Sequence, residues 1–151
     1  MHDNLFYAIG IAADAHNGQK DKAGMAYILH PLTVMHTVAK QLPNDIDAQC
    51  AAVLHDVVED TFHSLNTLRA AGVSERSLQL VEALTKREGE DYGAYLDRVI
   101  AAGVEAKIIK LADVLHNLHP DRLSQLSEER RQVLEPRYQR AIRRLSGIPE
   151  Q

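Results

Sequence analysis

The sequence contains little of what extracellular or strand-rich proteins use for stability. It has one cysteine, Cys50, and no tryptophan, and aromatic residues make up 5% of the chain. A single cysteine excludes an internal disulfide and is typical of a reducing compartment, so we expect a cytoplasmic protein. Because scarce aromatic residues stand beside abundant Ala, Leu, Glu, Lys and Arg, helices are favoured over strands. The expected fold class is therefore all-α.

Long apolar runs are missing as well. No segment approaches the roughly 18 consecutive apolar residues of a membrane-spanning helix, and residues 1–16 lack the basic region and cleavage site of a signal peptide. The formal net charge of −4 provides no general attraction to nucleic acid or to an anionic membrane. We therefore expect neither as a partner. The arginine-rich residues 130–144 are interpreted as the solvated face of a terminal helix rather than as a phosphate-binding surface.

The length of 151 residues, with 45% apolar composition, is sufficient for one hydrophobic core. No internal repeat or linker divides the chain, so we expect a single domain over residues 1–151. Pro31 is expected in the first turn of a helix, and Pro136 is expected to kink or break the last one. Periodicity and capping residues predict a compact bundle of about seven or eight short helices, near residues 4–16, 31–42, 45–60, 64–72, 74–84, 91–102, 104–119 and 128–145.

One stretch of expected helix carries charge inside an apolar run. In "AAVLHDVVEDT", residues 51–61, His55 lies one turn before Glu59, and Asp56 lies one turn before Asp60. On a helix these polar groups share one edge, and carboxylates buried there without a partner are costly. One interpretation is a divalent metal beside them. The other is an ordinary core helix with a solvated acidic end.

Two distant segments favour the metal. His30 precedes Pro31 at the start of an expected helix, and Asp113 interrupts the apolar helix of "IIKLADVLHNL". With His55 and Asp56 they form a set of two imidazoles and two carboxylates. Such a mixed nitrogen and oxygen set suits borderline or hard divalent ions that keep open, water-filled positions. We therefore predict His30, His55, Asp56 and Asp113 as metal ligands.

These motifs bring the chain close to a known family. The order H…HD…D resembles that of the HD-domain metal-dependent phosphohydrolases. The segments "AHNGQKDKAGMAYILHPLTV", "AAVLHDVVEDT", "LVEALTK" and "IIKLADVLHNL" are similar, in order and spacing, to the hydrolase domain of the RelA/SpoT-type enzymes and to the stand-alone small alarmone hydrolases. The resemblance extends from about residue 4 to residue 119, and it implies the HD-domain fold.

The resemblance also implies a reaction. In that family the residues matching the four predicted ligands bind one divalent metal, commonly Mn²⁺, and those matching Glu59 and Asp60 act on the attacking water. The family reaction removes the 3′-pyrophosphate from guanosine tetraphosphate or pentaphosphate, so a nucleotide is the expected small-molecule partner. The family's synthetase domain has no counterpart in these 151 residues, so the expectation is hydrolysis without synthesis.

The positions that would bind substrate match the family in part. Lys22 matches a family lysine, and Asn117 matches a residue that contacts ribose or phosphate. Asp21 stands where the family usually has an arginine that contacts the base, and a carboxylate there would repel a polyphosphate. Lys20 is the neighbouring cation expected to replace the lost charge. Tyr27 either lines the pocket or packs beneath the loop.

Two further departures are Val114, in place of a family arginine, and Ala26, in place of a proline. They leave three functions open. The leading one is alarmone 3′-pyrophosphate hydrolysis. The second is an HD phosphohydrolase that acts on a different phosphorylated nucleotide, and the third is a catalytically weak, nucleotide-binding regulatory module. Assembly into a homo-oligomer is left open as well.

The remaining histidines and the cysteine are expected to serve the structure. His116 is interpreted as a packing residue behind the ligands, and His16 as a hydrogen-bonding residue within its loop. Cys50 is interpreted as a small apolar filler of the core. The histidines expected at the surface or at helix ends are His2, His36, His63 and His119.

Overall fold

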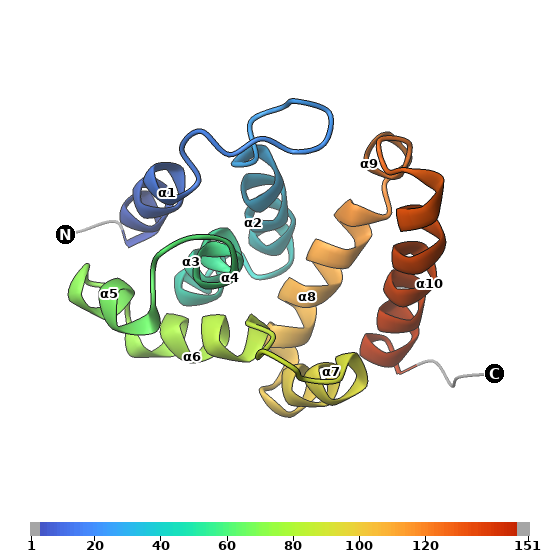
Figure 1. Ribbon diagram of the computed structural model, residues 1–151. Coiled ribbons are helices and arrows are strands. Elements are labelled where there is room, and N and C mark those ends of the chain that lie inside the picture. The colour runs from blue at the N-terminus through green and yellow to red at the C-terminus, as the bar shows by residue number, and fades with distance from the viewer. Residues whose placement is uncertain (1–3, 148–151) are drawn as a thin grey trace.

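The chain folds into helices joined by short loops (Figure 1). The structure, a computed structural model, describes residues 4–147. Within this range every regular element is a helix, and one isolated bridge pairs Lys20 with Ala26. The predicted all-α class is confirmed. The helices are α1 (Asn4–Ala15), α2 (Leu29–Gln41), α3 (Ile46–Leu54), α4 (Val57–Asp60), α5 (Leu65–Ala70), α6 (Glu75–Leu84), α7 (Tyr92–Ala101), α8 (Val104–Asn117), α9 (Pro120–Leu123) and α10 (Glu128–Leu145).

Several helices begin at a polar side chain that caps a backbone N–H. The Asp45 carboxylate accepts from the N–H of Ala48 at the start of α3. Ser64 and Ser74 cap α5 and α6 in the same way, as their positions before apolar periodic segments predict. Gly103 separates α7 from α8 with a φ of +115°, a conformation that L side chains rarely adopt. These local signals are strong because each depends on residues close in sequence.

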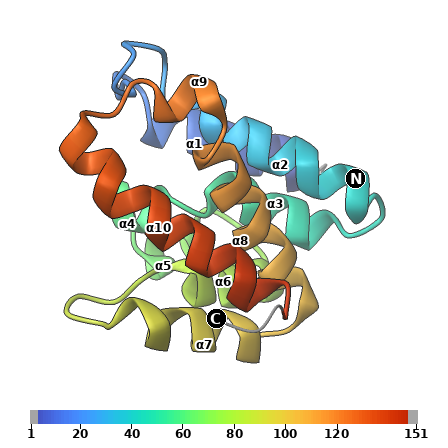
Figure 2. The ribbon, with the colours of Figure 1, turned by 90° about the vertical axis from the view of Figure 1, so that its right-hand side faces the viewer.

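The core is built around α3, whose residues 48–54 are all buried. Helices α1, α2 and α6 pack around it, and α8 packs against α2 on one side and against α7 and α10 on the other. Figure 1 shows α8 between the N-terminal helices and the pair α7 and α10, and Figure 2 shows α10 lying across α8. The long α8 therefore joins the two halves of the bundle, and a residue on its inner face can reach α2 and the end of α3.

The single helix predicted for residues 45–60 is wrong. Helix α3 ends at Leu54, and α4 begins at Val57, so His55 and Asp56 occupy the turn between them. The imidazole Nδ1 of His55 lies 2.6 Å from the carbonyl oxygen of Ala52, which also accepts the backbone N–H of His55 over 3.5 Å. The break changes the direction in which the side chains of His55 and Asp56 point. The polar edge predicted for one continuous helix therefore does not exist.

Other boundaries differ in ways that bear on the site. Helix α2 begins at Leu29, so Pro31 is its third residue and His30 lies inside its first turn. The short helix α9 was not predicted. Helix α10 is continuous through Pro136, so the expected break is wrong. Pro136 is exposed, and the carbonyl that its missing N–H leaves unpaired can therefore be solvated. None of the helices in residues 4–147 combines the length and apolar character needed to cross a bilayer.

Candidate metal centre and substrate cavity

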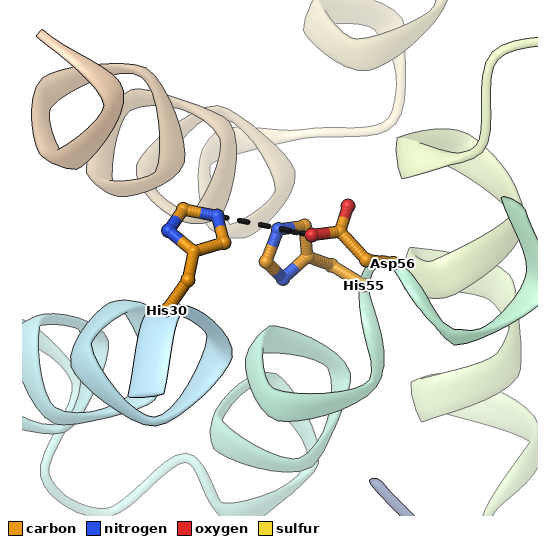
Figure 3. Close-up of side chains that lie close together, drawn as sticks. All are labelled: His30, His55 and Asp56. Carbon is orange, nitrogen blue, oxygen red and sulfur yellow. Dashed lines mark ion pairs between the residues drawn. The ribbon is translucent and has the colours of Figure 1, made fainter. Parts of the chain in front are cut away.

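Three segments far apart in the sequence bring the predicted ligands together. His30 comes from the first turn of α2, and His55 and Asp56 come from the turn between α3 and α4. Figure 3 shows these three side chains converging, and one ligand atom of each lies within 4.8 Å of those of the other two. The Asp56 Oδ2 atom is 3.1 Å from His55 Nε2 and 3.8 Å from His30 Nε2. The turn that interrupts the predicted helix is therefore the element that builds the cluster.

Asp113 on α8 completes the set. Its Oδ1 atom is 2.9 Å from His30 Nε2 and 3.4 Å from His55 Nε2. Both histidines and Asp113 are buried, and Asp56 is half-buried. The structure thus brings all four predicted ligands to one point, with two imidazole Nε2 atoms facing two carboxylates.

The arrangement of His55 fits a divalent cation. Its Nδ1 is engaged by the Ala52 carbonyl, which fixes the proton on that nitrogen and leaves the lone pair on Nε2. Nε2 is buried and makes no hydrogen bond among the described residues. A buried lone pair that faces two carboxylates is unfavourable unless a cation lies between them. Two imidazole nitrogens with two carboxylate oxygens are a donor set that borderline divalent ions accept.

Protons compete with a metal for this centre. Burial disfavours charge on His55, but the carboxylates of Asp56 and Asp113 outweigh it and raise the pKa of His55 well above its usual value. Burial acts against the charge on Asp56 as well, yet His55 lowers the pKa of Asp56 to about 2. Burial also opposes the charge on Asp113, but Lys110 and His55 hold the pKa of Asp113 well below its usual value. Both carboxylates are therefore ionised at neutral pH. Metal binding must displace the imidazole proton, because a ligating imidazole is neutral.

Tyr27 holds one of the carboxylates. Its hydroxyl donates a hydrogen bond of 2.6 Å to Asp56 Oδ2. Burial, and after it the charge of Asp56, raise the pKa of Tyr27, so the phenol keeps the proton that it donates. Tyr27 also lines the cavity described below. Both features place it beside the centre, and its predicted contact with substrate stays a prediction.

Lys110, which sequence reasoning missed, holds the other carboxylate. Its Nζ lies 2.9 Å from Asp113 Oδ2, and the Asn117 amide donates to Asp113 Oδ1 over 3.2 Å. Burial opposes the charge on Lys110, but Asp113 outweighs it and raises the pKa of Lys110 well above its usual value. The signal was present in "KLAD", where the lysine precedes Asp113 by three residues and so lies on the same helix face.

Replacing Lys110 by methionine is expected to destabilise the metal-free protein by about 3–5 kcal/mol, because the variant leaves a buried Asp113 carboxylate without its cation. Added Mn²⁺ should recover part of the loss, since it supplies positive charge at the same carboxylate. Urea unfolding with and without Mn²⁺ measures both effects. Lys107→Met, one turn earlier on α8, is the matched control. Equal stability of Lys110→Met and wild type without metal would contradict this role.

His116 lies behind His30 rather than among the ligands. The two Nδ1 atoms are 2.7 Å apart, and the rings are almost parallel, with an interplanar angle of 9°. Burial, and after it His30, lower the pKa of His116 to about 4, so His116 is neutral and can accept the Nδ1 proton of His30. His30 Nε2 is then left to face the carboxylates. This placement agrees with the packing role predicted for His116.

A cavity of about 480 Å³ opens at the candidate metal centre. This volume lies within the roughly 300–1,000 Å³ typical of small-molecule sites. All four predicted substrate residues line it, as do Glu59, Asp60 and three of the four predicted ligands. The cavity also has a set of basic residues that the sequence did not indicate, namely Lys86, Lys110, Arg122, Arg130 and Arg137.

The predicted water-activating pair lies at the edge of this cavity. The Glu59 carboxylate accepts the backbone N–H of Lys86, so a loop far along the chain fixes its position. Burial raises the pKa of Glu59. Burial, followed by repulsion from Asp56, also raises the pKa of Asp60. A carboxylate with a raised pKa is the stronger base, which suits proton abstraction from water.

Helix α10 also contributes to the cavity. Arg130 and Arg137, seven residues apart on one face, are exposed, as the solvated-face prediction expects, and both line the cavity. Arg137 lies over the ring of Tyr92, with the guanidinium 5.2 Å from the ring centre. The ion pairs found within 4 Å among residues 4–147 leave five cavity cations without a carboxylate partner: Lys20, Lys22, Lys86, Arg130 and Arg137.

The departures from the family pattern have structural counterparts. Asp21 does not face the cavity as a lone charge, because its Oδ2 lies 3.9 Å from Arg122 Nη1. Val114 is fully buried in the core, where it has no access to the cavity. Ala26 is exposed and pairs with Lys20 across the base of the loop. Of the three positions, only Asp21 bears directly on the site.

The remaining histidines and the cysteine are placed as follows. His16 Nδ1 lies 2.8 Å from Gln19 Oε1, which is the expected hydrogen bond within its loop. His36 is exposed, and His119 is exposed and caps α9. Cys50 is buried in the core, as predicted. His63, half-buried between α4 and α5, has its Nδ1 3.1 Å from Thr67 Oγ1, and His2 lies outside the described residues.

Comparison with known proteins identifies the family. A model of the family described as "HD domain" matches residues 8–139. The chain belongs to the HD domain family. A solved structure titled "A metazoan ortholog of SpoT hydrolyzes ppGpp and plays a role in starvation responses" superposes with a TM-score of 0.84, covering 98% of this chain and 88% of that one at 24% sequence identity. The HD-domain fold predicted from the motifs is therefore confirmed.

Curated relatives are longer proteins. The chain is 33% identical to the guanosine-3′,5′-bis(diphosphate) 3′-pyrophosphohydrolase of Haemophilus influenzae over 141 residues, covering 83% of this chain and 21% of that protein. It is 32% identical to the bifunctional (p)ppGpp synthase/hydrolase SpoT of Escherichia coli K12, covering 83% of this chain and 20% of that protein. It is 34% identical to a GTP pyrophosphokinase of Streptomyces coelicolor, covering 85% of this chain and 16% of that protein. The chain thus spans about a fifth of the length of these relatives.

Proposed function

We propose that this HD domain is a metal-dependent phosphohydrolase that removes the 3′-pyrophosphate from guanosine tetraphosphate and pentaphosphate. The observation that carries the proposal is one cavity that combines a cluster of two histidines and two carboxylates with five cations that have no carboxylate within 4 Å among residues 4–147. The names of two of its relatives, a guanosine-3′,5′-bis(diphosphate) 3′-pyrophosphohydrolase and a bifunctional (p)ppGpp synthase/hydrolase, support the same substrate.

His30, His55, Asp56 and Asp113 would hold the metal, and Mn²⁺ is the ion that we propose. The chemistry supplied by a bound divalent ion at such a site is polarisation of a phosphoryl oxygen and a lowered pKa of water. The protein itself fixes the four donors. Tyr27 and Lys110 each occupy one oxygen of a ligand carboxylate, and the Ala52 carbonyl sets the tautomer of His55.

Glu59 and Asp60 would handle the attacking water. Both lie at the cavity, both have raised pKa values, and Glu59 is anchored to the backbone of Lys86. A fixed carboxylate can take the proton of a water molecule as that water attacks phosphorus. Because the anchoring already fixes the carboxylate, less conformational entropy is lost when the reactive geometry forms.

The cations would bind the phosphates. They come from three walls: Lys20 and Lys22 from the loop before α2, Lys86 from the segment after α6, and Arg130 and Arg137 from α10. Charged walls around one cavity favour a polyanionic ligand, although the whole chain carries a net charge of −4. This contrast between cavity and surface favours a small polyphosphate over nucleic acid or membrane, and a cytoplasmic nucleotide suits it.

Purified protein loaded with Mn²⁺ and incubated with guanosine tetraphosphate is expected to release GDP and pyrophosphate in equal amounts. Ion-exchange chromatography of the products measures both. Release of a single inorganic phosphate, or no turnover with Mn²⁺ present, would contradict the proposed reaction.

The second candidate is an HD phosphohydrolase for a different phosphorylated nucleotide. It is favoured by Asp21, which places a carboxylate where a family arginine contacts the base. A panel of nucleotides with 3′-phosphates or 5′-phosphates, assayed with Mn²⁺, separates the two. Higher kcat/KM on an adenine or pyrimidine nucleotide would select this candidate.

A further inference from the structure

Asp21 and Arg122 form an ion pair across one end of the cavity. Asp21 lies on the loop before α2, Arg122 lies on α9, and both side chains line the cavity. The distance from Asp21 Oδ2 to Arg122 Nη1 is 3.9 Å, and the two side chains are 15% and 23% exposed. Figure 2 shows this loop and α9 at the same end of the molecule. The pair therefore connects two elements that the sequence analysis treated separately.

Asp21 is the fixed member of the pair. Its Oδ1 accepts the backbone N–H groups of Ala23, at 2.9 Å, and Met25, at 3.0 Å. Its own backbone N–H and carbonyl also bond within the loop, to Met25 and Gly24. The second carboxylate oxygen is left to face Arg122. The long, flexible side chain of Arg122 thus lies beside a carboxylate whose orientation is set by the loop.

The charge environment of Arg122 differs from that of five other cavity cations, two of which, Lys20 and Lys22, flank Asp21 on the same loop. Lys20, Lys22, Lys86, Arg130 and Arg137 have no carboxylate within 4 Å in the described part of the chain, whereas Arg122 has Asp21. Gln125 and Leu126 follow Arg122 and line the cavity too. A charge-balanced guanidinium beside an amide and an apolar side chain suits a neutral, planar group better than a phosphate. In a nucleotide, that group is the base.

We propose that Arg122, positioned by Asp21, binds the base of the substrate nucleotide through the face of its guanidinium. The proposal rests on the proposed function and assigns one end of that cavity. Asp21 then acts as a positioning residue. This role and simple repulsion of the polyphosphate predict opposite changes in substrate affinity. Loss of the Asp21 charge weakens binding if Asp21 positions Arg122, and it strengthens binding if Asp21 only repels the polyphosphate.

The decisive variants are Asp21→Asn, Arg122→Ala, Arg122→Lys and the double variant Asp21→Asn with Arg122→Ala. The amide introduced by Asp21→Asn keeps the Oδ1 acceptor for the loop N–H groups and removes only the charge. Arg122→Ala is expected to raise KM for guanosine tetraphosphate about tenfold with little change in kcat. Arg122→Lys should not restore KM, because an ammonium has no planar face. Asp21→Asn should raise KM alone and have no further effect when Arg122 is replaced by alanine.

Inorganic pyrophosphate, which has no base, separates base binding from phosphate binding. Its inhibition constant should be the same in wild type and in Arg122→Ala. Arg131→Ala, an exposed arginine paired with Glu135 on α10, is the control for loss of one positive charge. Thermal melting of each variant identifies those that fold. If Arg122→Ala does not fold, Arg122→Lys still decides the test.

Three results would overturn the inference: a lower KM for Asp21→Asn, an unchanged KM for Arg122→Ala, or weaker pyrophosphate inhibition in Arg122→Ala. In each of them wild type still hydrolyses guanosine tetraphosphate, so the proposed function stands. A wild-type protein that neither binds nor hydrolyses guanosine tetraphosphate would instead overturn the proposed function and, with it, the inference.

Discussion

Replacing Asp56 by asparagine is expected to lower kcat/KM for guanosine tetraphosphate by about three orders of magnitude. The variant removes one of two anionic donors that face the two histidine Nε2 atoms. A bound metal contributes several kcal/mol of transition-state stabilisation, and each 1.36 kcal/mol is a factor of about ten in rate. The Tyr27 hydroxyl can still donate to the asparagine oxygen, so the fold should persist.

Steady-state kinetics at saturating Mn²⁺, together with metal content after gel filtration, measure this effect. The expected metal content falls from one ion per chain toward zero. Asp14→Asn, an exposed aspartate on α1 that does not line the cavity, is the matched control and should keep both the activity and the metal. An Asp56→Asn protein with wild-type activity and a full complement of metal would contradict the ligand assignment.

The second large effect is expected for Glu59→Gln. The amide oxygen can still accept the N–H of Lys86, so the side chain stays in place while its basicity is lost. Loss of a general base lowers kcat by about 10²–10⁴-fold. Metal content and melting temperature should not change, because Glu59 lies outside the ligand cluster and the variant keeps the hydrogen bond to Lys86.

Asp60→Asn serves as the comparison for the same reaction, and Glu88→Gln, on the exposed loop after α6, serves as the control for charge. If Asp60 takes the proton, Asp60→Asn will show the larger loss in kcat. Full activity in both Glu59→Gln and Asp60→Asn would exclude this pair from water activation. Measured melting temperatures distinguish a chemical loss from an unfolded variant.

Local sequence signals predicted most of the fold. Asp45, Ser64 and Ser74 each precede an apolar periodic segment, which is typical of a helix cap, and the structure has a helix beginning after each of them. The break at His55 was not predicted, since nothing nearby competes with the helix except the imidazole of His55 itself. After the break, Asp56 faces His30 on α2 and His55 faces Asp113 on α8, and a local pattern does not contain these contacts.

The candidate site, like the fold, could be predicted from the sequence only in part. His30, His55, Asp56 and Asp113 could be named from motif spacing, and the structure places them at one point. Lys20 and Lys22 were also predicted, but Arg130 and Arg137 were not, because their spacing is that of an ordinary helix surface until α10 is placed across α8. The Asp21 to Arg122 pair depends likewise on the packing of α9 beside a distant loop.

The central claim is that donors from α2, the α3–α4 turn and α8 hold one divalent ion inside the substrate cavity. Anomalous diffraction at the manganese edge, from crystals grown with Mn²⁺, tests this most directly. The account predicts one strong peak per chain, within bonding distance of His30, His55, Asp56 and Asp113. Density with no peak among these four side chains, or a peak bound elsewhere, would contradict it.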